Sequence, residues 1–600
     1  MSAPAAGAAR PRSAAPLFSA RSEPRIASRI GLWLLLALVA LLFLWPVAML
    51  LAGIFRSAAP GMGGSWTLTN LLRVAGAGDT YAALFNSGLY AAATTALATA
   101  LGAVFAFLAA RTTAFGRQAL TPVMLLVFAA PNLLYAVAWS LLGDPGSGLL
   151  NQAARSVAGA DVTVFNAFSW SGMIAAQALK LSSFCYLLLL APFQNMNRSY
   201  EEASLISGAG RLQTLLRIDL PLMLPALFGV VILGAVFGLG AFDIPQILGA
   251  LAGIPVLSTE IYKVLNIAVP PDYAGASGLG LFMMAAVALL LALQWWLVKE
   301  QRFVTVTGKT FRQERWDLGR WNAPAGAAIA LFALATLVLP GIQLVLTSFQ
   351  PAIGVNRFTL ANYAAVLADR QTLRAFQVTA WLALSSGFLA MALALVLGQV
   401  GRRGPRWLRR LLDAATLTPI MMPGVVLAVG LLWAYISVPG LRQLYGTVWL
   451  ALVGLVVFVM PIASRAINGA LVQLAGELEE AASISGASPA RVLLDIVLRL
   501  ISRSFLGGWL VAGVIAAGTL DIPLLLLPAT RPNVAVLVYS DMSSGLPTQA
   551  SALLVLLLAA IALAALAAAL LALGLHRLRG GFARRRALRF ERSHAIPSTP

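Results

Sequence analysis

The feature that most constrains this chain is a series of long apolar runs. A membrane-spanning helix needs about 20 predominantly apolar residues, and twelve runs here approach or exceed that length. Charged residues make up only 11% of the sequence, against about 25% in an average protein. The runs do not alternate between polar and apolar residues, which excludes a membrane β-barrel. The sequence therefore predicts an all-α integral membrane protein with about twelve transmembrane helices. The predicted spans are residues 30–54, 82–110, 118–142, 170–192, 222–248, 277–298, 323–346, 374–400, 413–436, 446–464, 503–528 and 549–575.

Basic residues indicate how the chain is oriented. They outnumber acidic residues by 42 to 22 and are concentrated in every second predicted loop. Because loops rich in Lys and Arg face the cytoplasm, both termini are predicted to be cytoplasmic in a multi-pass membrane protein. The apolar run after the tail 1–29 is too long for a cleaved signal peptide. The basic linker 299–322 and the basic tail 576–600 are explained by topology and anionic lipids, so no nucleic-acid partner is predicted.

Residues suited to catalysis or metal binding are scarce. The chain has one cysteine, Cys185, and two histidines, His576 and His594. A disulfide within the chain, a Cys/His metal cluster and a histidine-based catalytic centre in the hydrophobic body are therefore excluded. No catalytic residue, no metal ligand and no cofactor bound by this chain are predicted.

The second half of the chain is a shorter-looped copy of the first. Six spans in each copy, with cytoplasmic ends, predict parallel repeats related by an axis along the membrane normal. A transport pathway between the two halves follows from this arrangement. The matching segments are 66–70 and 358–362, 201–209 and 479–487, and 243–245 and 521–523. The predicted organisation is a tail (1–29), a first repeat (30–298), a linker (299–322), a second repeat (323–575) and a basic tail (576–600).

Two predicted cytoplasmic loops, at about residues 196–221 and 470–500, have an unusual pattern for connectors. Each predicts a short helix with acidic residues at its start, which suit the helix dipole. Each helix is followed by a glycine, Gly208 or Gly486, which can adopt the left-handed conformation that ends a helix. A second short helix then leads into the next span, with Pro221 near its first turn in the first copy. Such a projecting helix-turn-helix predicts a docking partner.

These loops resemble the cytoplasmic E-A-A-x3-G loop of the permease subunits of binding-protein-dependent ABC importers. The resemblance covers nearly all of residues 30–575 and implies a MetI-like permease fold. Arg499 stands where the family pattern has a proline, so the hinge of the second loop departs from it. The matching residues are Glu202, Ala203, Ser204, Gly208, Ile218, Leu220 and Pro221 in the first loop, and Glu480, Ala481, Ala482, Gly486, Ile496 and Leu498 in the second.

In that family the loop seats on a separate nucleotide-binding subunit. The one Gly-Lys-Thr of this chain, at 308–310, has Phe303 where a phosphate-binding loop needs its first glycine. The resemblance therefore implies that ATP and Mg are bound by a partner, present in two copies, and that a periplasmic protein delivers the solute. The chain itself is predicted to be a transport subunit and not an enzyme.

Among fused two-repeat permeases, the chain looks most like the ferric-iron uptake type. The resemblance rests on the layout, on VTVTGK after span 6, and on IPVLSTEIYKVLN and PPDYAGAS before it. Similar permeases handle 2-aminoethylphosphonate, polyamines, thiamine or sulfate, and these remain alternatives. An ion-coupled secondary transporter would also have parallel six-span repeats, but it would carry midplane carboxylates and has no use for two docking loops.

A few polar residues fall within or beside the predicted spans. Lys180 lies near the middle of span 4, where an ammonium group needs water or a partner. That partner is either an anionic substrate or chelate, or an internal carboxylate or set of carbonyls. Asp243 and Asp521 are predicted near the periplasmic ends of their spans, each followed by a proline, Pro245 or Pro523. These elements form a gate or re-entrant turn, or they are plain helix ends.

Overall fold

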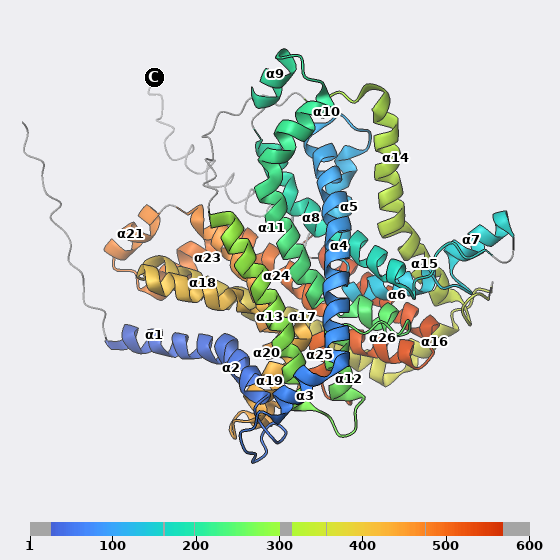
Figure 1. Cartoon of the computed structure of the whole chain (residues 1–600). Coiled ribbons are helices and arrows are strands. Elements are labelled where there is room, and N and C mark those ends of the chain that lie inside the picture. Colours follow the sequence, from blue (N-terminus) through green and yellow to red (C-terminus); the bar gives the residue numbers. More distant parts are fainter. Residues whose placement is uncertain are drawn as a thin grey trace, which may run out of the picture.

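The computed structural model of this protein is built from helices (Figure 1). It describes residues 26–159, 162–196, 199–299, 315–355, 357–474, 476–567 and 570. In these residues extended pairing is limited to two isolated bridges, Arg56 with Trp66 and Thr112 with Trp316. The predicted all-α membrane fold is confirmed: the described part contains nine helices long and apolar enough to span a bilayer, or twelve if three bent pairs each count as one span.

The first repeat begins with α1 and α2, which are joined by a π-helical turn and together form the first span. The predicted first-repeat elements are all present, with three short helices added in the connections. The helices are α1 (Ile26–Val39), α2 (Trp45–Gly53), α3 (Thr69–Gly76), α4 (Gly78–Arg111), α5 (Arg117–Ala129), α6 (Asn132–Leu142), α7 (Leu149–Ala158), α8 (Trp170–Asn195), α9 (Ser199–Ile206), α10 (Arg211–Thr214), α11 (Leu220–Gly240), α12 (Leu257–Asn266) and α13 (Tyr273–Lys299).

The second repeat follows the same order, so that α4 corresponds to α17, α8 to α20 and α9 to α21. A further helix over Pro547–Ala567 corresponds to α13. The helices are α14 (Asn322–Ala333), α15 (Leu339–Phe349), α16 (Ala361–Ala368), α17 (Arg370–Arg403), α18 (Arg406–Met421), α19 (Gly424–Ile436), α20 (Val448–Val472), α21 (Gly476–Ile484), α22 (Pro489–Arg491), α23 (Leu498–Leu500), α24 (Ser502–Gly518), α25 (Asp521–Leu526) and α26 (Val534–Ser543).

Two spans predicted as single helices, 118–142 and 413–436, are bent pairs, and a third bend lies just before the predicted span 503–528. Helices α5 and α6 meet at 99°, α18 and α19 at 112°, and the segments Pro489–Leu500 and Ser502–Gly518 at 79°. The first two breaks occur at Pro131 and Pro423, which precede α6 and α19 in an extended conformation. Proline lacks the N–H that a helix interior needs and disfavours helical conformation in the residue before it. The proline therefore ends one half-helix and begins the next.

The half-helices α6 and α19 form the centre of the molecule. All residues from Leu133 to Leu142 and from Gly424 to Ile436 are buried, as expected of helices that are apolar on every side. Each is covered by the first span of the other repeat, because α2 packs on α19 and α15 packs on α6. This reciprocal exchange holds the two repeats together.

The outer helix faces are apolar and exposed. Large side chains such as Trp33, Phe85, Leu289 and Trp295 are more than half exposed. In a soluble protein such a surface would be unusual, whereas lipid covers it in a membrane, with every backbone group satisfied inside the helices.

Candidate functional sites at the paired loops and the inter-repeat contact

The first candidate site is the loop around α9. The helix closes as predicted, because Gly208 adopts a left-handed φ of +85° and Ala209 N–H donates to the Ser204 carbonyl at 3.1 Å. The Ser204 hydroxyl also bonds the Thr214 hydroxyl at 2.9 Å, which ties the two short helices together. Any side chain at position 208 would be strained by the left-handed backbone.

The outer face of this loop is open to a partner. Glu202 and Ala203 are exposed, and Ile206 is 86% exposed. A surface hollow of about 510 Å³ lies between α9 and the start of α11. Four of the predicted motif residues line it: Ala203, Ser204, Ile218 and Pro221. The full lining is Tyr200, Ala203, Ser204, Ser207, Arg217, Ile218, Pro221 and Leu222.

The inner face is held by a residue that the motif did not single out. Glu201 is buried and forms an ion pair with Arg111 at the end of α4, which is buried too. Its other carboxylate oxygen accepts a hydrogen bond from the Trp316 indole N–H at 2.8 Å. The Trp316 ring in turn packs edge-on against Phe107 at 5.6 Å. Glu201 thus joins α9, α4 and the inter-repeat linker; the Glu-Glu doublet repeated in both loops was the available signal.

The second loop has the same shape with a different anchor. Gly486 has a φ of +83°, and Ala487 N–H donates to the Ala482 carbonyl at 3.0 Å. The motif residues Glu480 and Ala481 are exposed. In Figure 1, α9 and α21 both lie along the upper left edge of the molecule, while α3, α12 and α16 lie toward the lower right. The two predicted docking helices therefore project from one side.

The anchor of the second loop is Glu479. It accepts hydrogen bonds from Gln399 at 2.6 Å and Arg403 at 2.7 Å, and it pairs with Arg402 at 3.4 Å. Burial alone would raise the pKa of Glu479, but the hydrogen bonds from Arg403 and Gln399 and the charges of Arg402 and Arg403 hold it below its ordinary value. The two arginine side chains are 27% and 41% exposed, so this anchor lies closer to water than the first.

The exits from the two loops also differ. The first runs without a break from Arg211 to Gly240, so the helix does not begin near Pro221 as predicted but passes through it after a π-helical turn at Leu215–Asp219. The second exit bends by 79° at Ile501, two residues after Arg499. The Ser502 hydroxyl bonds the Arg499 carbonyl at 2.9 Å, a local bond of the kind that competes with helix continuation.

Lys180 contacts main-chain carbonyls. Its ammonium group donates to the carbonyls of Val127, Phe128 (2.9 Å) and Ala130 (2.6 Å). These are the free carbonyls at the end of α5, where the proline break leaves them without helical partners. A cation at a helix C-terminus is also favoured by the helix dipole. Of the two kinds of partner predicted for Lys180, the structure shows the internal one, a set of carbonyls. These contacts stabilise the broken helix.

Asp243 and Asp521 lie beyond the ends of their helices, which stop at Gly240 and Gly518 and so do not reach residues 248 and 528 as predicted. Both are more than nine-tenths buried. The side chain of Asn132, the first residue of α6, interacts with Asp243. The Asp521 carboxylate lies against the backbone of Gly424, the first residue of α19, so closely that a Cβ there would overlap it.

The prolines after these aspartates are buried too. Pro245 begins a π-helical turn at Pro245–Gly249, and Pro523 lies in α25. Both therefore lie in short helical segments whose residues are mostly buried.

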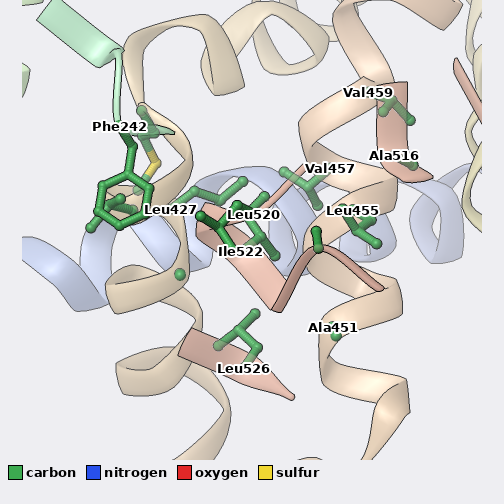
Figure 2. Packing of buried hydrophobic residues seen from close by; sticks show 14 of the residues in the cluster. Phe242, Leu427, Ala451, Leu455, Val457, Val459, Ala516, Leu520, Ile522 and Leu526 are labelled. Atoms are coloured by element: carbon green, nitrogen blue, oxygen red, sulfur yellow. The ribbon is translucent and has the colours of Figure 1, made fainter. Parts of the chain in front are cut away.

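The same segments also contact the other repeat closely. A Cβ on Gly240 would lie 3.1 Å from Pro423 of the second repeat, and a Cβ on Gly518 would overlap Pro131 of the first. Figure 2 shows Phe242 next to Leu427 of α19, with Leu520 and Ile522 close by. Each broken span thus meets the helix end of the other repeat, and the two aspartates converge on this contact.

Several known proteins have sequences similar to this one. The family model described as "Binding-protein-dependent transport system inner membrane component" matches residues 98–303 and 388–585. The chain is 30% identical over 353 residues to a probable ABC transporter permease protein, y4fN, of Sinorhizobium fredii, covering 57% of this chain and 61% of the relative. It is 26% identical over 406 residues to the ferric transport system permease protein FbpB of Actinobacillus pleuropneumoniae, covering 66% and 58%.

A third relative is the trehalose/maltose transport system permease protein MalF of Thermococcus litoralis, 30% identical over 207 residues, covering 33% of this chain and 69% of the relative. The chain spans about three fifths of the length of the first two relatives. The family model covers both repeats, including both candidate loops and both aspartates. The chain therefore belongs to the family of binding-protein-dependent transport system inner membrane components.

Proposed function

We propose that this chain supplies both halves of the membrane-spanning part of an ATP-driven importer in a bacterial inner membrane. The observation that carries the proposal is the pair of exposed helix-turn-helix loops, each closed by a left-handed glycine and both on one side of a chain that matches the permease family twice. Because the basic residues lie in the same set of loops, that side is cytoplasmic, as are both termini.

The partners follow from the loops. Two loops of one shape suit two copies of one nucleotide-binding ATPase, which would hold ATP and Mg. Each loop presents a glutamate and small residues outward, Glu202 and Ala203 in the first and Glu480 and Ala481 in the second. A periplasmic binding protein delivers the solute on the opposite side. The complex then contains one permease chain for two ATPase subunits.

The proposed solute is ferric iron. Its support is the likeness to ferric transport permeases, such as FbpB of A. pleuropneumoniae. The permease relatives also include one named for trehalose and maltose and another for sn-glycerol-3-phosphate, so the family alone does not fix the solute. 2-Aminoethylphosphonate, polyamines, thiamine and sulfate remain the alternative solutes.

The test is a gene deletion with uptake measurements. Loss of the gene should lower accumulation of radioactive iron in iron-limited cells, and a plasmid copy should restore it. The copy number is checked by mass determination of the purified complex. Unchanged iron uptake, with loss of growth on an aminophosphonate or loss of polyamine uptake, would replace the iron proposal. Two permease chains in each complex would contradict the one-to-two assembly.

A further inference from the structure

The inter-repeat contact brings two carboxylates from different repeats to one place. Gly240, three residues before Asp243, touches Pro423, and the next residue, Gly424, lies against Asp521. The reciprocal contact repeats this: Gly518 touches Pro131, and the next residue, Asn132, interacts with Asp243. Asp243 and Asp521 also interact electrostatically. Asn132 is exposed, so this contact borders an accessible surface.

The charges at this contact do not balance. Two buried carboxylates side by side repel each other unless a proton or a cation lies between them. Of the described residues, Lys180 is the cation that acts on Asp243, and its donors are already directed to three carbonyls of α5. One ammonium against two carboxylates leaves a net negative site, which favours a cationic solute and repels an anionic one.

A third oxygen points to the nature of the cation. Tyr90 of α4 is 1% exposed, and its hydroxyl has no hydrogen-bonding partner among the residues that the structure describes. One oxygen of Asp243 is likewise buried and unpartnered within the described residues. The Tyr90 hydroxyl and the Asp243 carboxylate interact electrostatically. Because buried polar atoms are nearly always paired, two orphan oxygens near a second carboxylate indicate a ligand of oxygen-preferring, hard-metal character.

We propose that Asp243, Asp521 and Tyr90 form a transfer site for a hard metal cation at the contact between the repeats. The cation passes between the two carboxylates when the contact opens, and its charge offsets their repulsion. The site rests on the proposed function, since ferric iron is such a cation, and it deepens that function by excluding sulfate and phosphonates as solutes.

The test uses the whole complex in proteoliposomes, with iron(III)-loaded binding protein outside and ATP supplied to the ATPase. The double variant Asp243→Asn and Asp521→Asn keeps the shape of both side chains but removes their charges. Iron uptake per ATP should fall at least about tenfold, while stimulation of ATP hydrolysis by the loaded binding protein is retained. Asp413→Asn is the matched control, because Asp413 is half exposed on α18 and pairs with Arg409 of the same helix. Equal uptake by the double and control variants would overturn the site.

Tyr90→Phe gives a second test that does not depend on transport. During turnover with iron, the wild-type complex should show the visible charge-transfer absorption of an iron(III)–phenolate bond, and Tyr90→Phe should lack it while keeping the fold. Absence of a Tyr90-dependent band in the wild type would overturn the role of Tyr90. If the wild type moves spermidine and not iron, the ferric proposal fails, and loss of spermidine uptake in the double variant would leave a cation site of different selectivity. Transport of sulfate or aminophosphonate that is unimpaired in the double variant would overturn both the ferric proposal and the cation site.

Discussion

The two projecting loops share their outer shape but differ in how the protein holds them. In the first loop, Glu201 is enclosed with Arg111 and Trp316, and the following helix runs straight into its span. In the second, Glu479 is held by two partly exposed arginines, and the following helix bends at Ile501. A displacement of α9 is therefore transmitted directly to α4, α11 and the linker, whereas a displacement of α21 can be absorbed at the bend.

This difference teaches that a repeated surface motif does not imply a repeated mechanism. In the proposed assembly, the outer residues of the two loops meet two copies of one ATPase, which require similar outer faces. The inner residues are set by the helices behind each loop, and these differ: Trp316 of the linker bonds Glu201 in the first loop, whereas residues of α17 hold Glu479 in the second. We expect the first loop to transmit a displacement to the membrane helices more rigidly than the second.

The largest expected effect comes from breaking the anchors. Glu201→Gln removes the carboxylate that pairs with buried Arg111 and leaves Asp219 as an acidic group whose charge acts on it, and breaking a buried ion pair costs up to about 3–5 kcal/mol. Glu479→Gln leaves arginines that water reaches, for which about 1 kcal/mol is expected. Thermal unfolding of the purified chain should therefore show a much larger loss for Glu201→Gln. Asp413→Asn on the exposed face of α18 is the control, and equal losses in the two loop variants would contradict the difference in burial.

The second prediction concerns the glycines. Gly208 and Gly486 have nearly the same positive φ, +85° and +83°, so replacement by valine should cost each loop a similar amount, at least about 1 kcal/mol. The effect on transport should differ, because only the first exit is a continuous helix. We expect Gly208→Val to raise the ATP hydrolysed per solute imported more than Gly486→Val. The measurement is the ATP hydrolysed per solute imported in proteoliposomes. Equal ratios in the two variants would contradict the asymmetry, and wild-type ratios in both would contradict a coupling role for the loops.

The third prediction concerns pH. The pKa of Glu479 is lowered in the folded protein, so its anchor contributes stability above the unfolded pKa of about 4.3 and loses it as the pH falls through the lower folded value. The protection of α21 amides from hydrogen exchange, corrected for intrinsic rates, should therefore persist at pH 5 and weaken only below about pH 4. Glu479→Gln should show weak protection at every pH. Loss of protection already at pH 5 in the wild type would contradict this.

Much of the fold could be predicted because apolar length and internal repetition are properties of the sequence alone. The twelve runs and the matching loop segments identify the spans and their pairing. The bends at Pro131 and Pro423 were missed although prolines marked them, since a proline inside an apolar run is also tolerated in an intact membrane helix. The bend at Ile501 carries no proline, and it depends on how α24 packs against α17.

The residues of the candidate sites could likewise be predicted only in part from the sequence. Gly208 and Gly486 were recognisable because a glycine after a short helix has a local reason to be there. Glu201 and Glu479 were not, because their partners Arg111, Trp316 and Arg403 lie about 75 to 115 residues away in the chain. The spacing of Asp243 and Asp521 from the loops placed them near span ends, but only the folded interface between the repeats brings them to one contact.

The smallest effect is expected from Arg499→Pro, which gives the second loop the proline that the first has at Pro221. Both positions follow a π-helical turn, Leu215–Asp219 in the first loop and Val492–Val497 in the second. Such a turn changes the hydrogen-bond register of the helix, and the first loop accepts its proline there without a break. We therefore expect Arg499→Pro to change the unfolding free energy by less than about 1 kcal/mol, well below the cost of about 3 kcal/mol for proline in a regular helix.

The same variant separates two explanations of the asymmetry between the loops. If the proline made the first loop stiff, Arg499→Pro would stiffen the second and bring the Gly208→Val and Gly486→Val uncoupling ratios together. If the bend at Ile501 makes the second loop compliant, the ratios stay apart, because the bend lies after the substituted residue and is closed by the bond from Ser502 to the Arg499 carbonyl, which proline retains. We expect the second result. Equal ratios in the Arg499→Pro background would assign the stiffness to the proline.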